Sequence, residues 1–245
     1  KLFLDAGNKA GAAGYYEKAG ELDRAIELFV DAGDARGRAR CLMVGIPPKG
    51  KLGPKHLERL REAARALGDA RDPKAVDLFV RAGEFARAGE IARAARDYPH
   101  AAELFARAGR HSDGADCAAK AGNRQLSAFL LSEGGEFNKA AALYEQLGKL
   151  DEAAECAGKT DDAELKARLF GRVGDLLGQA RILVTLKREA EAVAVIAKIP
   201  KDSPTWDEYR VLVADIHHGA GRHKQAAQGY AEGLYPELHL REEVA

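Results

Sequence analysis

The 245-residue chain has few of the residues that mark several common classes of protein. It contains only three cysteines, Cys41, Cys117 and Cys156, which are too few and too scattered for a disulfide framework and predict a reducing, cytoplasmic location. No apolar run approaches the roughly 20 residues that a helix needs to span a bilayer, and the start does not resemble a signal peptide. Its 38 basic and 38 acidic residues cancel, so the chain lacks the positive excess that drives nucleic-acid binding. These features favour neither a secreted, nor a membrane-spanning, nor a nucleic-acid-binding protein.

The chain also contains few strand-forming residues, whereas alanine, leucine, arginine and glycine are abundant. Alanine favours helix strongly, and valine, isoleucine and threonine, which favour strands, are sparse. The 26 glycines stand out in a composition that is otherwise helical. Since glycine inside a helix costs about 1 kcal/mol relative to alanine, we expect most of them to lie between helices.

The glycines end a phrase that recurs at fixed intervals. It reads Leu-Phe-Val-Asp-Ala-Gly at 28–33 and Leu-Phe-Ala-Arg-Ala-Gly at 104–109. Related phrases occupy residues 2–7, 28–33, 78–83, 104–109, 143–148 and 169–174. The offsets 28 − 2, 104 − 78 and 169 − 143 all equal 26, while 143 − 104 is 39, or three times 13. The elementary unit is therefore about 13 residues and two units form one repeat, which is the signature of a stacked array.

Each unit predicts one short helix and its stop. In the best-defined unit, Ala101, Leu104, Phe105 and Ala108 have the spacing of one helix face, and Gly109 stands where the helix must end. An isolated helix of three turns is marginal in water, so each unit needs its neighbours. The predicted fold class is all-α: a right-handed α–α superhelix, or solenoid, of tandem antiparallel helix pairs.

We expect a single solenoid over residues 1–245, forming a segment of a longer array, because the phrase at 2–7 reads as the end of a helix that starts upstream. Irregular breaks are expected near 47–54 and 200–204, where prolines interrupt the pattern. Asp161 and Glu164 have the spacing of a capping box, which predicts a helix start. Helices are expected at 8–19, 21–32, 34–45 and 54–68, in regular units from 73 to about 174, then at 176–186, 188–198 and from 205 to about 220.

The last helix pair has a different pattern of small and aromatic residues. The pattern consists of Ala214, Gly221, Ala226, Tyr230 and Gly233, followed by Pro236. Over residues 205–238 the chain here resembles a tetratricopeptide repeat. The earlier phrases resemble the shorter helical hairpins of tetratricopeptide-like solenoids in transport-coat and intraflagellar proteins, although their period is 26 residues and not the usual 34 or so. The resemblance implies a protein-binding scaffold with no catalytic residues and no cofactor.

Three motifs suggest other chemistry, and each has a simpler interpretation. The segment Gly45–Leu52 nearly matches a phosphate-binding loop, but Leu52 stands where serine or threonine must hold magnesium. His217, His218 and His223 lack the spacing of a zinc-binding helix and are interpreted as solvated or packing residues. Cys117 and Cys156 are 39 residues apart; a metal or redox pair is one interpretation, and two small buried apolar residues is the one we favour. No catalytic, cofactor-binding or metal-binding residue is therefore predicted, and the chain is not expected to be an enzyme.

Aromatic residues supply the candidate binding residues. Tyr15, Tyr16, Trp206 and Tyr209 form two close pairs that suit anchoring of a bound peptide or partner. The alternative is that one residue of each pair packs between neighbouring helices.

The predicted function is a non-catalytic protein–protein interaction scaffold that binds a partner protein or peptide on the solenoid surface. One alternative is the helical regulatory arm of a larger multidomain enzyme or signalling protein. A third possibility, a helical enzyme, predicts a buried acid or base with a perturbed pKa in a groove.

Overall fold

A computed structural model describes residues 8–204 and 206–234. Within these ranges the chain forms sixteen helices and no strand, so the all-α solenoid of tandem helix pairs predicted from the sequence is confirmed. The expected helix end at 2–7 and the last residues of the 205–238 segment lie outside the described residues. No described helix combines the length and the apolar character that crossing a membrane requires.

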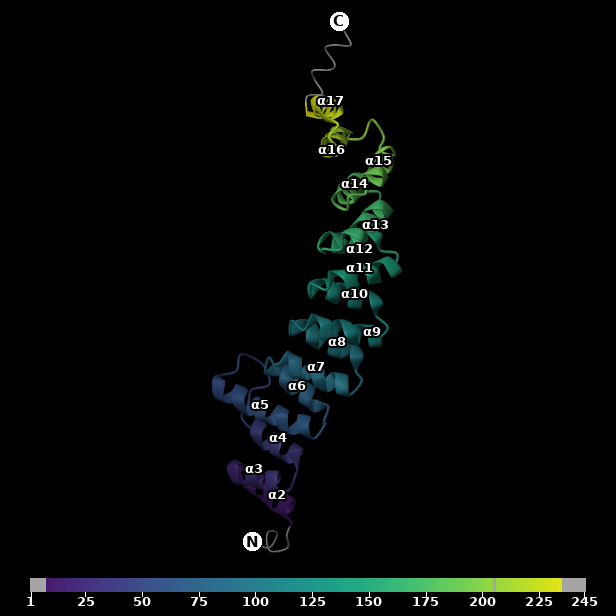
Figure 1. Ribbon diagram of the computed structural model, residues 1–245. Coiled ribbons are helices and arrows are strands. Elements are labelled where there is room, and N and C mark those ends of the chain that lie inside the picture. Colours follow the sequence, from purple (N-terminus) through teal and green to yellow (C-terminus); the bar gives the residue numbers. More distant parts are fainter. Residues whose placement is uncertain (1–7, 205, 235–245) are drawn as a thin grey trace. The chain divides into compact units, whose positions relative to one another are not determined.

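The chain forms two compact units, Lys1–Gly135 and Glu136–Ala245, and whether they make one solenoid stays a prediction. The first unit contains α2 (Lys9–Ala19), α3 (Leu22–Asp31), α4 (Ala35–Met43), α5 (Pro54–Asp69), α6 (Lys74–Arg81), α7 (Phe85–Ala94), α8 (Tyr98–Arg107), α9 (His111–Lys120) and α10 (Arg124–Glu133) (Figure 1). The second contains α11 (Phe137–Gln146), α12 (Leu150–Gly158), α13 (Ala163–Val173), α14 (Leu176–Thr185), α15 (Glu189–Ile196), α16 (Trp206–Gly219) and α17 (His223–Leu234).

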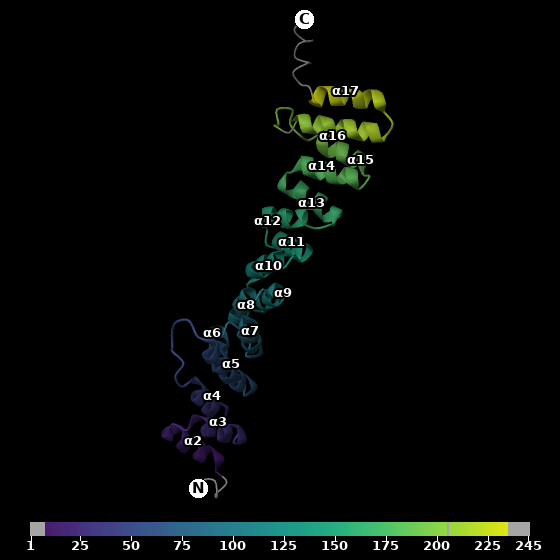
Figure 2. The same cartoon turned by 90° about the vertical axis from the view of Figure 1, so that its left-hand side faces the viewer.

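Within each unit, successive helices pack against one another and are joined mostly by a few residues. Two connections are longer: residues 44–53 between α4 and α5, which form an extended loop in Figure 2, and residues 197–205 between α15 and α16. Both include the proline-containing segments at which the sequence predicts breaks.

Helix ends recur every 13 residues. Residues with left-handed backbone stand at Gly83, Arg96, Gly109, Gly122, Gly135 and Gly148, and again at Gly174 and Lys187. At Gly109 the geometry is a Schellman motif, because the Gly109 N–H donates to the Ala106 carbonyl and the Arg110 N–H donates to the Phe105 carbonyl. The sequence phrases identify the glycines, but Arg96 and Lys187 adopt the same conformation without being glycine.

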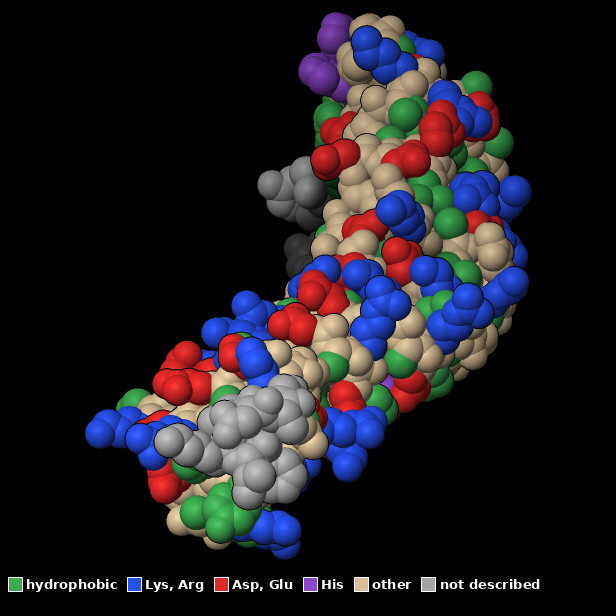
Figure 3. All heavy atoms as spheres, turned by 90° about the horizontal axis from the view of Figure 1, so that it is seen from below, with side chains coloured by type: hydrophobic (Ala, Val, Ile, Leu, Met, Phe, Trp, Pro, Cys, Tyr) green, Lys and Arg blue, Asp and Glu red, His purple; other side chains and the backbone are tan. Residues whose placement is uncertain are grey.

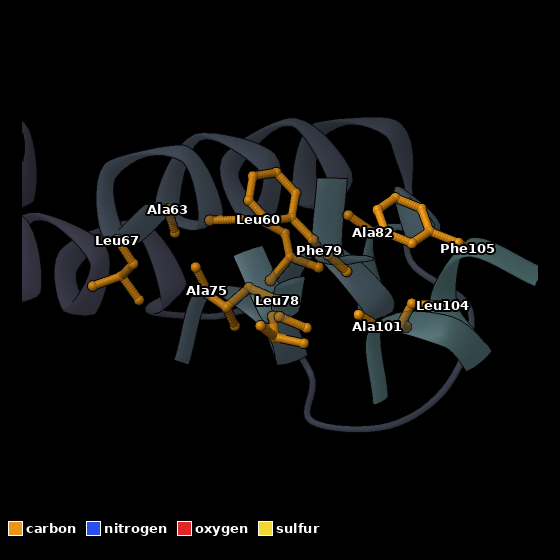
Figure 4. Close-up of a cluster of buried hydrophobic side chains, with 14 of the residues drawn as sticks. Leu60, Ala63, Leu67, Ala75, Leu78, Phe79, Ala82, Ala101, Leu104 and Phe105 are labelled. Atoms are coloured by element: carbon orange, nitrogen blue, oxygen red, sulfur yellow. The ribbon is translucent and has the colours of Figure 1, made fainter. Parts of the chain in front are cut away.

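The helices share one burial register, counted from the N-cap residue. In α8, with Asp97 as N-cap, positions 4, 5, 7 and 8 are Ala101, Ala102, Leu104 and Phe105, all buried. Leu104 and Phe105 belong to a cluster that joins α4 to α9 within the first unit (Figure 4). Small side chains at positions 4 and 5 allow helices to approach closely. At Gly89, position 5 of α7, an added Cβ would lie 3.0 Å from the Phe105 ring.

The three cysteines all occupy position 7. Cys41, Cys117 and Cys156 follow their N-cap residues by seven positions in α4, α9 and α12; all three are buried, and none is in a disulfide. Burial raises the pKa of the Cys41 and Cys117 thiols, which keeps them neutral. The interpretation of Cys117 and Cys156 as small buried residues is confirmed.

One predicted cap is off by one residue. Asp162, not Asp161, caps α13, since its side chain accepts a 2.9 Å hydrogen bond from the Leu165 N–H. Thr160 favours Asp162 as the cap, because its hydroxyl accepts a hydrogen bond from the Asp162 N–H and donates one to the Ala157 carbonyl.

Arginines link alternate helices through carboxylates. In the first unit Arg110 of the α8–α9 turn bonds Glu90 of α7 at 2.6 Å, and Arg93 of α7 bonds Asp113 of α9 at 2.8 Å. In the second unit Glu145 of α11 accepts from Arg168 and Arg172 of α13. Each of these pairs joins two helices that have one other helix between them in the sequence.

Glu145 gives a pH-dependent prediction. The Arg168 guanidinium, helped by Arg172, holds the pKa of Glu145 below its usual value. A depressed folded-state pKa stabilises the protein above the unfolded-state pKa of about 4.3, and this contribution is lost as the pH falls through the folded-state value. We expect Glu145→Gln to lower the free energy of unfolding at neutral pH by up to about 1 kcal/mol, and to have a smaller effect at pH 3. Urea unfolding at both pH values measures this.

The matched control is Glu103→Gln, because Glu103 is exposed and no Lys or Arg of the described residues pairs with it. The assignment is contradicted if both variants lose the same free energy of unfolding at neutral pH. It is also contradicted if the loss in Glu145→Gln is undiminished in acid.

Candidate partner-binding surfaces

Trp206 and Tyr209, one of the predicted aromatic pairs, lie together at the start of α16. Their ring centroids are 4.2 Å apart with an interplanar angle of 68°, an edge-to-face contact. Both side chains are half-buried. The Arg210 guanidinium lies 5.7 Å from the centre of the Trp206 ring, so a cation also contacts the pair.

The two rings line a groove of about 430 Å³ between α16, α17 and the loop before them. We call it the α16–α17 groove, and its lining residues are Lys201, Trp206, Tyr209, Arg210, Val213, His217, Gln225, Gln228 and Gly229. None of these lining residues is acidic, whereas two are cationic. Figure 2 shows α16 and α17 side by side; they approach so closely at Gly229 that an added Cβ would lie 2.9 Å from the Ala214 Cβ.

The polar groups of the groove are fixed by their surroundings. Burial raises the pKa of the Tyr209 hydroxyl, which therefore stays protonated. The Arg222 Nε donates to His217 Nδ1 at 2.8 Å, so this imidazole accepts a hydrogen bond at that nitrogen. His218 and His223 pack edge-to-face with ring centroids 5.4 Å apart. The three histidines thus pack with neighbouring side chains; the described residues hold no group of three His, Cys, Asp or Glu side chains suited to a metal ion.

The other predicted pair is divided between core and surface. Tyr16 is half-buried at position 8 of α2 and packs against the cluster of Ala13, Ala25 and Phe29. Tyr15 is 68% exposed. Packing between helices, the alternative interpretation, therefore applies to Tyr16, and Tyr15 is the member of the pair that is available to a partner. The two pairs belong to different compact units.

Phe129 is a candidate that the sequence analysis missed. It occupies position 6 of α10, counted from the N-cap Asn123, and is 50% exposed. The same position in the other regular helices is charged and exposed in six cases and is Ala142 in α11; the charged residues are Glu90, Glu103, Asp116, Glu155, Arg168 and Arg181. When the 13-residue units are aligned with one another, this aromatic residue stands at a position that is charged in most units. The sequence itself therefore marks Phe129 as unusual.

Charges elsewhere on the surface are mixed. On the face shown in Figure 3, basic and acidic side chains alternate without a large area of one sign. Four carboxyl groups of the described residues have a pKa that is lowered by hydrogen bonding to an Arg or Lys, as in structural ion pairs; they are Asp72, Glu145, Glu152 and Glu191. None of them lines the α16–α17 groove.

Comparison with known proteins adds little to this description. No protein-family model and no curated protein matches the chain. Among solved structures it is similar to the nearly identical TPR-like repeats of a putative kinesin light chain from Podosopora anserina, at 15% identity over 96% of this chain and 95% of that one, with a TM-score of 0.19. A second structure of these repeats has 15% identity, coverage of 92% and 91%, and a TM-score of 0.18.

A circular tandem repeat protein is 16% identical, covering 94% of this chain and 55% of that one, with a TM-score of 0.13. TM-scores this low do not establish a shared overall fold. The fold rests on the chain's own helices.

Proposed function

We propose that this protein is a non-catalytic, cytoplasmic interaction scaffold that binds a partner protein or peptide on the solenoid surface. The observation that carries the proposal is the α16–α17 groove, where Trp206 and Tyr209 share one concave site with Lys201 and Arg210. Tryptophan, tyrosine and arginine are the residues that most often dominate binding energy at protein interfaces.

The groove favours a segment with negative charge. Its lining supplies cations and amide donors but no carboxylate, so an acidic side chain or chain terminus of the partner meets no like charge there. The Trp206 and Tyr209 rings already contact each other, which reduces the entropy lost when a ligand orders them. The apolar faces of the two rings and Val213 provide the surface that a ligand would bury.

The test begins with affinity purification of the full-length protein from its own cells, followed by binding measurements with each purified partner. We expect Trp206→Ala and Tyr209→Ala each to weaken binding by about 30-fold or more, the size of a hot-spot residue. Val193→Ala is the control, since it removes an exposed apolar side chain of the same unit that does not line the groove. Partners whose affinity is unchanged by both groove variants, with helix content retained, contradict a binding role for this groove; if no protein binds the chain, the scaffold proposal itself is wrong.

A further inference from the structure

The first unit contains a second groove of different character, formed by α3, α4 and α5. Its volume is about 690 Å³, larger than that of the α16–α17 groove. We call it the α3–α5 groove, and its lining residues are Gly20, Leu22, Asp23, Ile26, Glu27, Leu42, Arg59 and Glu62. Three aliphatic residues, Leu22, Ile26 and Leu42, form its apolar part.

The groove lies where the 13-residue stack is interrupted. In α7 to α14, position 5 of every helix is a buried glycine or alanine, as in Gly89, Ala102 and Ala115. In α3 the same position is Ile26, which is only half-buried. The chain then leaves the regular spacing after Met43 through the loop 44–53, and the longer helix α5 follows. A larger, half-buried side chain therefore stands at position 5 in the helix pair that precedes the irregular connection.

Carboxylates surround the apolar part. Asp23 and Glu27 are exposed and four residues apart on α3, so two like charges face the same side of the helix and repel. Within the described residues neither forms an ion pair with a Lys or Arg. Glu62, on α5, bonds Arg38 at 2.6 Å. The one cation of the lining, Arg59, donates to the Cys41 carbonyl at 3.1 Å, which holds it against α4.

We propose that the α3–α5 groove binds a basic amphipathic segment of a partner protein. Aliphatic side chains of that segment pack on the half-buried Leu22 and Ile26, and its Lys or Arg side chains pair with Asp23 and Glu27. The two carboxylates are about 6 Å apart along the helix axis, from a rise of 1.5 Å per residue. Basic residues four apart on a helix, or two apart on a strand, match this spacing. This site is opposite in charge to the α16–α17 groove and shares with the proposed function only the premise that the chain binds proteins.

The test is a selection on the purified full chain from a library of random peptides about 12 residues long, roughly three helical turns. We expect one enriched class to combine aliphatic residues with Lys or Arg at spacings of two or four. An enriched peptide of this class, made synthetically, is then titrated against the parent chain and the variant Asp23→Lys/Glu27→Lys. The double variant weakens binding by at least about tenfold, and added salt weakens binding to the parent chain.

Two further variants separate the possible causes. Glu103→Lys/Asp116→Lys reverses the same number of exposed charges in α8 and α9 and leaves the affinity for the basic peptide within about twofold, apart from the general effect of net charge. Ile26→Ala, which shortens the apolar contact, weakens it severalfold. Helix content and the unfolding midpoint show that each variant is folded.

Enrichment of acidic peptides alone overturns the proposal and leaves the scaffold function standing. Equal loss of affinity in both charge-reversal variants also overturns it, because the attraction is then general. If no peptide class is enriched while the α16–α17 variants still weaken binding to a purified partner, the α3–α5 groove is wrong and the scaffold proposal holds.

Discussion

Replacing Phe105 with alanine is expected to lower the free energy of unfolding by about 3–5 kcal/mol, the usual cost of deleting a fully buried phenylalanine. The ring is 0% exposed at position 8 of α8 and lies against Gly89 of α7. Guanidiniums of Arg93 and Arg110 lie 5.1 and 4.9 Å from its centre. Loss of the ring therefore leaves a cavity and also removes the support of two arginines that bond Asp113 and Glu90. Urea unfolding followed by circular dichroism measures the change.

Phe129→Ala is the matched control. It deletes the same side chain from the same unit, but at position 6, where the ring is 50% exposed. We expect a change within about 0.5 kcal/mol. If the two substitutions cost the same, the burial register is wrong.

Gly109→Ala is expected to lower the free energy of unfolding by about 1–2 kcal/mol, solely through the backbone. Gly109 ends α8 with φ of 72°, in the left-handed region, and no atom lies within 4 Å of an added Cβ. A methyl group therefore meets no neighbour, and its cost comes from its own backbone. The free energy of unfolding is measured as for Phe105→Ala.

Gly14→Ala is expected to change stability in the opposite direction. Gly14 lies inside α2, and an added Cβ there also has open space. In regular helix, alanine is favoured over glycine by about 0.5–1 kcal/mol, so the variant gains stability. Destabilisation of comparable size by both substitutions contradicts the backbone explanation.

Arg96→Gly extends this argument to a helix end that has no glycine. Arg96 has φ of 63° at the end of α7, so glycine relieves its strained backbone. We expect a gain of about 0.5–1 kcal/mol, the strain relief minus the added freedom of the unfolded chain. A loss of stability indicates that the arginine side chain contributes more than its backbone costs.

Local features of the fold follow from the sequence because they depend on residues close together in the chain. The phrase at 104–109 predicts the end of α8, since a helix stop needs only glycine and the preceding turn. The spacing of 39 between Cys117 and Cys156 predicts their shared buried position for the same reason. The predicted cap of α13 is one residue early because two adjacent aspartates can each cap the helix. The Thr160 hydroxyl favours Asp162, since it accepts a hydrogen bond from the Asp162 N–H.

The first aromatic pair follows the helical register only in part. Tyr16 stands at position 8 of α2, a buried position of that register, and packs with Phe29, whereas Tyr15 at position 7 remains exposed. Trp206 and Tyr209 are one turn apart on α16, which the sequence indicates. Their groove needs Lys201 from the preceding loop and Gln225 from α17.

The sequence alone therefore determined the all-α class, the 13-residue unit, most helix boundaries and the buried face of each helix, because helix stops and amphipathic spacing act within about one unit of the chain. Tertiary structure decided which arginines pair across alternate helices and where the two grooves of opposite charge lie. Each of these depends on side chains from different helices, and their proximity is set by how the helices stack. The α3–α5 groove illustrates the difference: the sequence marks the interruption near 47–54, but only the packing of α3, α4 and α5 brings Ile26, Leu42 and Glu62 to one site.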